Sequence, residues 1–165
     1  MRHDLDAALV RDFPALYRDR RGDTSATRMC DGFPGDGWEA LLRRMSEVLE
    51  PSSAATGVRA WQVKEKLGGL RVYLTEGAQP PEVRAAVEAA ESESLRTCEA
   101  CGAPGRPRRL AGVSTLCDEC ATFAAEYQEH RWDPEWRARR GAEAGRRLTL
   151  EEAFRRWRRT PDGPR

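Results

Sequence analysis

The sequence predicts an α+β protein with three parts: a small helix–hairpin–helix domain at residues 1–97, a four-cysteine module at 98–130 and a basic helical extension at 131–165. Three observations predict this arrangement. In the first part, apolar residues recur at helical spacing in some segments and alternate with polar residues in others. Two Cys-x-x-Cys pairs follow, with fifteen residues between them. The chain then ends in a segment rich in arginine and tryptophan.

The first helices are predicted from their apolar faces and their boundaries. Residues 4–18 place Leu5, Leu9 and Val10 on one face. A loop rich in glycine follows, and then a second run of apolar residues at helical spacing, which comprises Trp38, Leu41, Leu42, Met45, Val48 and Leu49. Asp36 and Glu39 have the spacing of a capping box. We expect Pro51 to stop this helix, so that the segment PSSAATG is a linker.

A β-hairpin and a third helix complete the first part. Residues 58–66 and 70–74 alternate as strands do, and Gly68-Gly69 between them predicts the turn. Pro81 then opens a segment with good helical composition, at a position where proline is favoured. A hairpin of two strands needs helices over its apolar face, so we expect a small layer of helices on it.

The N-terminal segment and the distribution of charge indicate the compartment and a candidate contact surface. The chain begins MRHDLDAALVRDFP, which is charged from residue 2 and has no apolar run of membrane-spanning or signal-peptide length. The sequence therefore predicts a cytoplasmic protein without a membrane partner. The net charge is only +1, but the last 35 residues carry 11 basic against 6 acidic residues. A contact with a polyanion is therefore predicted there rather than over the whole surface.

The two Cys-x-x-Cys pairs predict a zinc site. A spacer of two residues lets both thiolates of a pair reach one ion, and two pairs complete a tetrahedral set. The predicted ligands are Cys98, Cys101, Cys117 and Cys120. Gly102 permits a tight turn after the first pair, residues 107–116 have the composition of a short hairpin, and residues 121–131 that of a helix. Knuckle, hairpin and helix in this order are typical of a treble-clef-like module.

We expect this site to be structural. Four sulfur ligands leave no position open for water or a substrate, so no catalytic residue is predicted. A zinc deaminase would need a His-x-Glu sequence before the cysteine pair, and the chain has only His3 and His130. The fifth cysteine, Cys30, is expected to be a small buried thiol rather than a ligand.

Two resemblances accompany these motifs. CEACGAPGRPRRLAGVSTLCDECA resembles the zinc finger of DksA/TraR-type transcription factors, but the long helical hairpin with which those proteins reach RNA polymerase has no counterpart before it. Over about residues 13–121, the motifs CDGFPGDGW and QVKEKLGGLRVYL together with the cysteine module resemble small uncharacterised proteins of phages, prophages and bacteria. This resemblance implies a phage or mobile-element context, and it does not indicate an activity.

A weaker pattern raises a magnesium-dependent nuclease as an alternative. Gln62-Val63-Lys64 can stand in for the acid-x-Lys triplet of PD-(D/E)xK enzymes, in which carboxylates hold magnesium and lysine contacts phosphate. The candidate acids Asp31 and Asp36 precede a helix rather than lie on a neighbouring strand. Turn formation and helix capping are the alternative roles for these two residues.

The sequence therefore leaves two main functions open. The first is a zinc-stabilised, non-enzymatic binding protein directed at an unidentified protein partner, which it contacts through a loop that contains Asp31, Phe33, Asp36 and Trp38. The second is nucleic-acid binding through the arginines of the zinc hairpin and the tail, which are Arg106, Arg108, Arg109, Arg155, Arg156, Arg158 and Arg159. The tail residues Trp132, Trp136 and Trp157 would then stack on bases or, alternatively, dock on the protein's own core.

Overall fold

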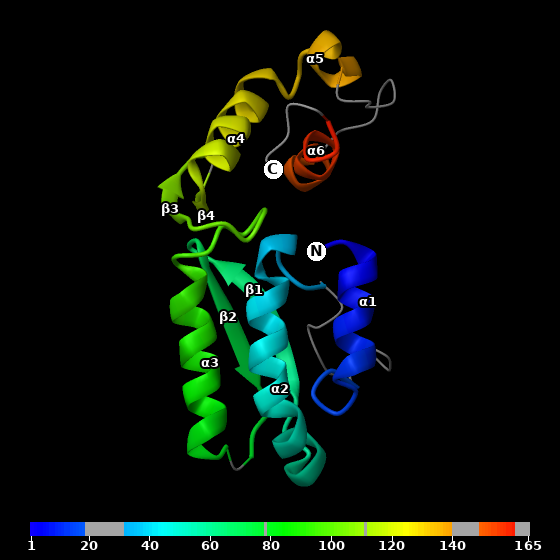
Figure 1. Ribbon diagram of the computed structural model, residues 1–165, viewed down its shortest axis with the longest axis vertical. Coiled ribbons are helices and arrows are strands. Elements are labelled where there is room, and N and C mark those ends of the chain that lie inside the picture. Colours follow the sequence, from blue (N-terminus) through cyan, green and yellow to red (C-terminus); the bar gives the residue numbers. More distant parts are fainter. Residues whose placement is uncertain (19–31, 78, 111, 140–148, 161–165) are drawn as a thin grey trace.

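The chain forms two lobes stacked along one axis in a computed structural model (Figure 1). The structure describes residues 1–18, 32–77, 79–110, 112–139 and 149–160. The N-terminal lobe, residues 1–97, and the C-terminal lobe, residues 98–160, each have their own cluster of buried hydrophobic residues. The predicted mixture of helices and small antiparallel hairpins is confirmed.

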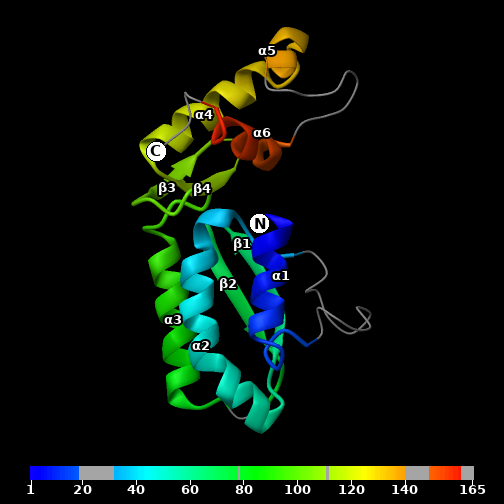
Figure 2. The same cartoon turned by 45° about the vertical axis from the view of Figure 1, so that its right-hand side comes forward.

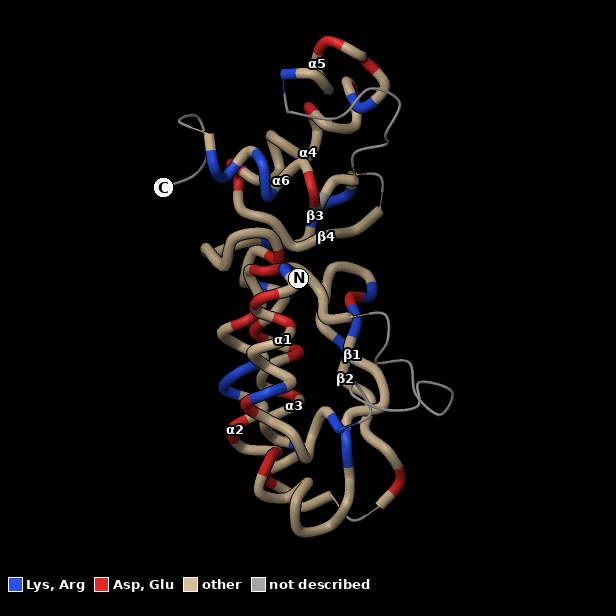
Figure 3. The backbone as a smooth tube through the Cα atoms, turned by 90° about the vertical axis from the view of Figure 1, so that its right-hand side faces the viewer, with Lys and Arg blue, Asp and Glu red and all other residues tan. Residues whose placement is uncertain are grey.

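The N-terminal lobe is a layer of helices on a two-stranded sheet. Its elements are α1 (His3–Asp12), the short 3₁₀ helix η4 (Asp36–Trp38), α2 (Glu39–Thr56), β1 (Ala60–Lys66), β2 (Gly69–Leu74) and α3 (Pro81–Ser94). In Figure 3 the three α-helices lie on one side and the two strands on the other. The core between them contains Leu9, Leu42, Leu49, Val63 and Leu70, each at most 2% exposed.

Helix α2 continues past Pro51, so the expectation that this proline stops the helix is wrong. The segment predicted as a linker forms the last turns of the helix, whose axis changes direction in its lower part (Figure 2). Tertiary contacts on both sides of the proline explain this. Leu49 and Ser53 are buried, and the Glu50 carboxylate accepts hydrogen bonds from two backbone amides of the chain after α1. These contacts offset the hydrogen bond that proline cannot make.

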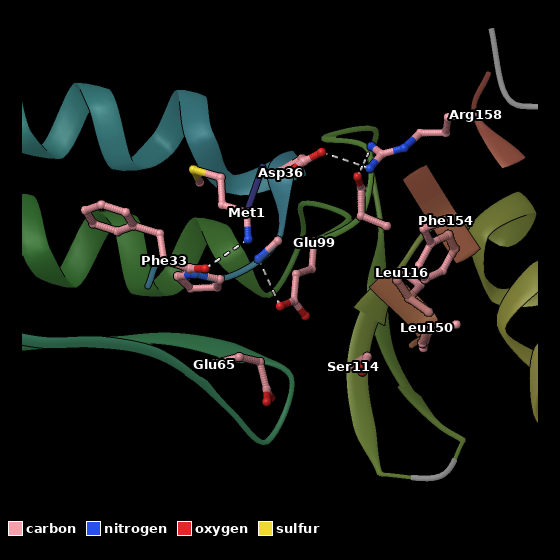
Figure 4. Close-up of a pocket in the computed structure, with 13 residues that line it drawn as sticks. Met1, Phe33, Asp36, Glu65, Glu99, Ser114, Leu116, Leu150, Phe154 and Arg158 are labelled. Atoms are coloured by element: carbon pink, nitrogen blue, oxygen red, sulfur yellow. Dashed lines mark hydrogen bonds and ion pairs between the residues drawn. The ribbon is translucent and has the colours of Figure 1, made fainter. Parts of the chain in front are cut away.

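The hairpin turn is displaced by one residue from its predicted position. Lys66 pairs with Gly69, so the two turn residues are Leu67 and Gly68 and not Gly68-Gly69. Both have positive φ, at 54° and 82°. This is the backbone of a type I′ turn, whose twist matches that of the two strands. The turn points toward the C-terminal lobe (Figure 4).

Helix α3 begins at Pro81, as predicted, and satisfies the outer edge of the sheet. The Ser94 hydroxyl accepts a hydrogen bond from the Leu70 amide at 2.8 Å, and the Glu91 carboxylate accepts one from the Val72 amide at 3.0 Å. Strand β2 is an edge strand, and its amides would otherwise need water or another strand. The helix therefore both covers the hairpin and closes its edge.

The C-terminal lobe joins the cysteine module to the end of the chain. It contains β3 (Arg106–Arg109), β4 (Val113–Leu116), α4 (Asp118–His130), α5 (Pro134–Arg139) and α6 (Leu150–Trp157). The ring of Trp157 stacks on Phe123 of α4 with centroids 4.4 Å apart and planes within 9°. Trp136 is also buried in this cluster. The predicted division at residue 130 therefore does not separate two cores, because residues on both sides of it pack together.

Candidate metal centre

The first cysteine pair lies on a tight turn that connects the two lobes. The amide of Gly102 donates to the carbonyl of Cys98 at 2.8 Å, and the Cys98 amide donates to Ala103 at 2.8 Å. Gly102 has φ +82°, a conformation that side chains with a Cβ rarely adopt. This closed turn brings the thiols of Cys98 and Cys101 to one side, as the sequence predicts.

The second pair begins helix α4. The sulfur of Cys117 accepts a hydrogen bond from the Cys120 amide at 3.4 Å, which gives the helix its N-terminal cap. Strand β4 ends directly before this pair, and β3 pairs with β4 in an antiparallel hairpin. The hairpin therefore carries the chain from the first pair to the second and returns it to the same place.

The four sulfur atoms form one cluster, all within 4.8 Å of one another. Cys101 Sγ and Cys117 Sγ are 3.7 Å apart. In a regular tetrahedron with metal–sulfur bonds of about 2.3 Å, neighbouring sulfurs are about 3.8 Å apart. Cys98 and Cys120 are buried, and the other two thiols are half-buried. The cluster therefore has the dimensions of a tetrahedral thiolate site that could hold a metal ion.

The electrostatics of the cluster favour one thiolate. A hydrogen bond from Cys101, with a second from Cys120, lowers the pKa of Cys98. The hydrogen bond with Cys101 in turn raises the pKa of Cys120, because the thiols of Cys101 and Cys120 cannot both ionise so close to the Cys98 thiolate. A bound cation would remove this conflict by stabilising every thiolate. The donor set is therefore suited to a cation, and without one the raised pKa keeps Cys120 a thiol beside the Cys98 thiolate.

The arginines of the β3–β4 hairpin are held differently from one another. Arg108 bonds to the Leu116 carbonyl and to the Asp118 carboxylate, and Arg106 also reaches Asp118, at 3.3 Å. Asp118 lowers the positive charge available from this hairpin, and Arg108 in turn lowers the pKa of Asp118. Arg109 is exposed, with no side-chain hydrogen bond or ion pair to any described residue. Only Arg109 of the three is thus unengaged within the described chain.

The predicted partner-binding loop instead forms the junction of the two lobes. Phe33 and Trp38 are 5% and 0% exposed, so the expectation that these rings lie on a contact surface is wrong. The Trp38 indole donates to the Thr97 carbonyl at 2.8 Å, and the Gly37 amide donates to the Glu99 carbonyl at 2.8 Å. These bonds tie the loop to the first cysteine turn. Asp31 lies outside the described residues, as does Cys30.

Asp36 does not cap α2, contrary to the expected capping box. Its carboxylate accepts a hydrogen bond from the Arg2 amide at 2.6 Å, and it pairs with Arg158 at 3.2 Å. Helix α2 has no side-chain cap at its N-terminus. Asp36 therefore links the start and the end of the chain across the junction, and Figure 4 shows this ion pair beside the first cysteine turn.

A pocket of about 300 Å³ lies at the junction (Figure 4). Its polar groups are mostly acidic and include Glu65, Asp36 and Glu99, while Phe33 and Phe154 supply apolar walls. Burial raises the pKa of Glu99 to about 7. The amide of Gly35 donates to this carboxylate at 3.3 Å. Sequence reasoning missed Glu99. The residue lies between two cysteine ligands in the chain, and nothing in the local pattern indicates that it packs against the distant loop that contains Gly35.

The tail residues divide between the core and the surface. Trp136 and Trp157 are buried in the core of the C-terminal lobe, as expected if these rings dock on the protein itself rather than stack on bases. Trp132, in contrast, is 61% exposed. Arg158 bonds to the Ala100 carbonyl as well as to Asp36. Arg155, Arg156 and Arg159 lie on or just after α6, and Arg159 is exposed. The capping box of Thr149 and Glu152, at the start of α6, has both of its hydrogen bonds.

Among the residues that the structure describes, those of the nuclease alternative do not come together as a metal site. Gln62 is buried at 5% exposure, and the ammonium group of Lys64 lies 5.1 Å from the centroid of the Tyr73 ring. Asp36 is occupied by two arginines. Among the described residues, the four cysteines are the only set of three or more metal ligands within reach of one ion.

Comparisons with known proteins add no relative. No family model, no curated protein and no solved structure matches this chain. None of the described helices is both long and apolar enough to cross a membrane.

Proposed function

We propose that this chain is a zinc-stabilised, non-enzymatic binding protein that recognises another protein. The four-thiolate cluster supports the structural role of the metal, because zinc prefers such ligands and a complete set leaves no position for a substrate. The order of cysteine turn, hairpin and helix supports a treble-clef-like module. The metal would hold the C-terminal lobe together, and the junction loop would fix it to the N-terminal lobe.

One residue carries the proposal of a protein partner. Leu67 occupies the first position of the type I′ turn with φ +54°, and its side chain is 73% exposed. A bulky side chain in this backbone region costs about 1–2 kcal/mol, and asparagine or glycine is the usual choice there. A leucine that is both strained and exposed gains nothing within the fold. Its side chain would gain from burial against a partner.

Two further exposed leucines lie on the elements next to this turn. Leu95 at the end of α3 is 37% exposed and lies next to Gly69, and Leu110 at the tip of the β3–β4 hairpin is 39% exposed. The turn itself contacts the same hairpin, since the hydroxyl of Thr115 donates to the carbonyl of Gly68 at 2.6 Å. We call Leu67, Leu95 and Leu110 the junction leucines. They offer apolar area at a place where both lobes meet, which suits a protein surface.

The experiment combines stability with binding. Leu67→Asn should raise the free energy of unfolding by about 1 kcal/mol, because asparagine tolerates positive φ. The same change should remove capture of the partner, measured by photo-crosslinking from a bacterial lysate with the probe beside the turn. Val48→Gln, which removes an exposed apolar side chain from α2, is the control and should leave capture unchanged. Equal capture by wild type and Leu67→Asn would exclude the junction leucines as the contact.

The remaining predictions on context fit this proposal. A reduced, cytoplasmic setting would keep the four thiols available for metal. The resemblance to phage and prophage proteins, and that of the cysteine module to DksA/TraR-type fingers, stay predictions from the sequence. Nucleic-acid binding remains a second candidate, and the specific observation that favours it is a group of arginines at the junction rather than the zinc hairpin.

A further inference from the structure

A second cleft at the junction is lined mainly by arginine. It has a volume of about 330 Å³, and its walls are Arg2, Leu5, Asp36, Arg155, Arg158 and Arg159. The first three come from the N-terminal lobe, whereas the other three lie on α6 or directly after it. Figure 3 shows basic residues along α6 and at its end. The cleft therefore brings the two ends of the chain together around a concentration of positive charge.

The charges in this cleft do not balance. Four guanidinium groups face a single carboxylate, that of Asp36, which leaves an excess of three positive charges. Asp36 is already engaged by the Arg2 amide and by the guanidinium groups of Arg2 and Arg158, and its side chain is only 10% exposed. Arg158 is held by this pair and by the Ala100 carbonyl. The excess therefore belongs mainly to Arg155 and Arg159, because the Nε atom of Arg2 also lies 3.6 Å from the Asp4 carboxylate.

Arg155 has a buried donor that no described residue accepts. The Nε atoms of Arg2 and Arg155 are both buried without a hydrogen bond to a described residue, but that of Arg2 lies 3.5 Å from the Asp36 carboxylate. Within the described chain, the side chains of Arg155 and Arg159 form no ion pair. A buried donor without an acceptor is destabilising, above all when the group is charged. Arginines with this surplus of donors are arranged to receive an acceptor with several oxygens.

We propose that this cleft binds a phosphate group. A planar guanidinium offers paired donors that match two oxygens of a phosphate, and those of Arg155 and Arg159 line this cleft beside Arg2. The C-terminus of α6 carries a partial negative charge that disfavours a bound anion. Two of its carbonyl groups, those of Phe154 and Arg156, already accept hydrogen bonds from the amides of Arg158 and Arg159. The cleft is large enough for a phosphate with an attached sugar. The group belongs either to a small phosphorylated molecule or to a nucleic-acid strand.

The position of the cleft gives phosphate binding a measurable consequence. Its walls come from both lobes, so a bound phosphate would add contacts that exist only when the lobes are docked. Anything that binds the folded protein alone stabilises it by mass action. The melting temperature of the metal-loaded full chain should therefore rise with the concentration of inorganic phosphate, at constant ionic strength.

The test uses matched changes of charge. Arg155→Gln and Arg159→Gln should each weaken phosphate binding roughly tenfold in calorimetric titration, since each removes charged hydrogen bonds. Arg109→Gln removes the same charge from the zinc hairpin, outside the cleft, and should leave binding unchanged. Metal content and far-ultraviolet circular dichroism show that each variant is folded. Absence of phosphate binding by the wild type, or an equal loss in Arg109→Gln, would overturn the proposal.

A second arm identifies the source of the phosphate. A short single-stranded oligonucleotide that competes with inorganic phosphate, and whose binding weakens with salt and with both cleft variants, would indicate a nucleic-acid strand. Binding of inorganic phosphate without competition by the oligonucleotide would indicate a small phosphorylated molecule. Oligonucleotide binding that is insensitive to Arg155→Gln and Arg159→Gln would place nucleic acid elsewhere and count against the cleft.

Discussion

The two lobes have different sources of stability. The N-terminal lobe buries a core of regularly spaced aliphatic residues between three helices and a hairpin. In the C-terminal lobe the described strands have four residues each, and the buried cluster combines five aromatic rings with small residues and with Cys98 and Cys120. Small units with a limited core generally need metal ions or disulfides. Metal removal should therefore destabilise the C-terminal lobe directly and the N-terminal lobe only through the junction.

The largest effect is therefore expected from loss of the metal. Cys101→Ser should unfold the C-terminal lobe, because a structural zinc ion contributes about 10–16 kcal/mol in small zinc domains, more than such a lobe can supply by itself. Cys101 is only half-buried, so the change costs little packing. The buried rings of Trp136 and Trp157 should become exposed, and tryptophan fluorescence should shift to longer wavelength.

The control for this experiment is Cys30→Ser, since Cys30 belongs to neither Cys-x-x-Cys pair. It should keep both the metal content and the fluorescence of the wild type. Hydrogen exchange should show that helices α2 and α3 of Cys101→Ser stay protected, because their cluster of buried residues has no member in the C-terminal lobe. Loss of protection throughout the chain would show that the N-terminal lobe cannot fold alone.

The sequence predicted local features well where local spacing determines them. The cysteine cluster, the hairpin between its pairs and the start of α3 at Pro81 follow from patterns within a few residues. It failed where a distant residue decides the outcome. Pro51 stays within a helix because Glu50 bonds to the segment after α1, and Asp36 leaves its expected cap for Arg2 and Arg158. Partners 34 and 122 residues away are invisible to a local pattern.

The junction itself can be broken by adding one carbon atom. A Cβ at Gly37 would lie 2.1 Å from the Cys98 carbonyl oxygen and 2.4 Å from the Gly102 amide nitrogen. Both atoms are backbone of the first cysteine turn and cannot rotate away. Gly37→Ala should therefore separate the lobes and lower the free energy of unfolding by about 3 kcal/mol, as overpacking does. Chemical denaturation measures this change.

Gly112→Ala is the matched control for the junction, because nothing lies within 4 Å of a Cβ at that position. It should change the free energy of unfolding by less than about 0.5 kcal/mol. Gly37→Ala should also weaken phosphate binding if the arginine cleft requires docked lobes. A Gly37→Ala variant as stable as Gly112→Ala would mean that the loop and the cysteine turn are not in contact in solution.

The smallest effect concerns the pH dependence of the junction. Burial raises the pKa of Glu99 from 4.5 to about 7, so the folded protein retains a proton there that the unfolded chain releases. The free energy of unfolding contributed by this group should therefore fall as pH rises from about 4.5 to about 7, and be lowest above that range. Glu99→Gln, which keeps an acceptor for the Gly35 amide, should be slightly more stable than the wild type at about pH 8 and closer to it at about pH 5.5. Urea unfolding of both proteins at the two pH values measures the difference, with metal content checked at each. A difference that does not change with pH would show that Glu99 is charged and solvated in the folded protein, and that the junction beside the cysteine turn is open to water.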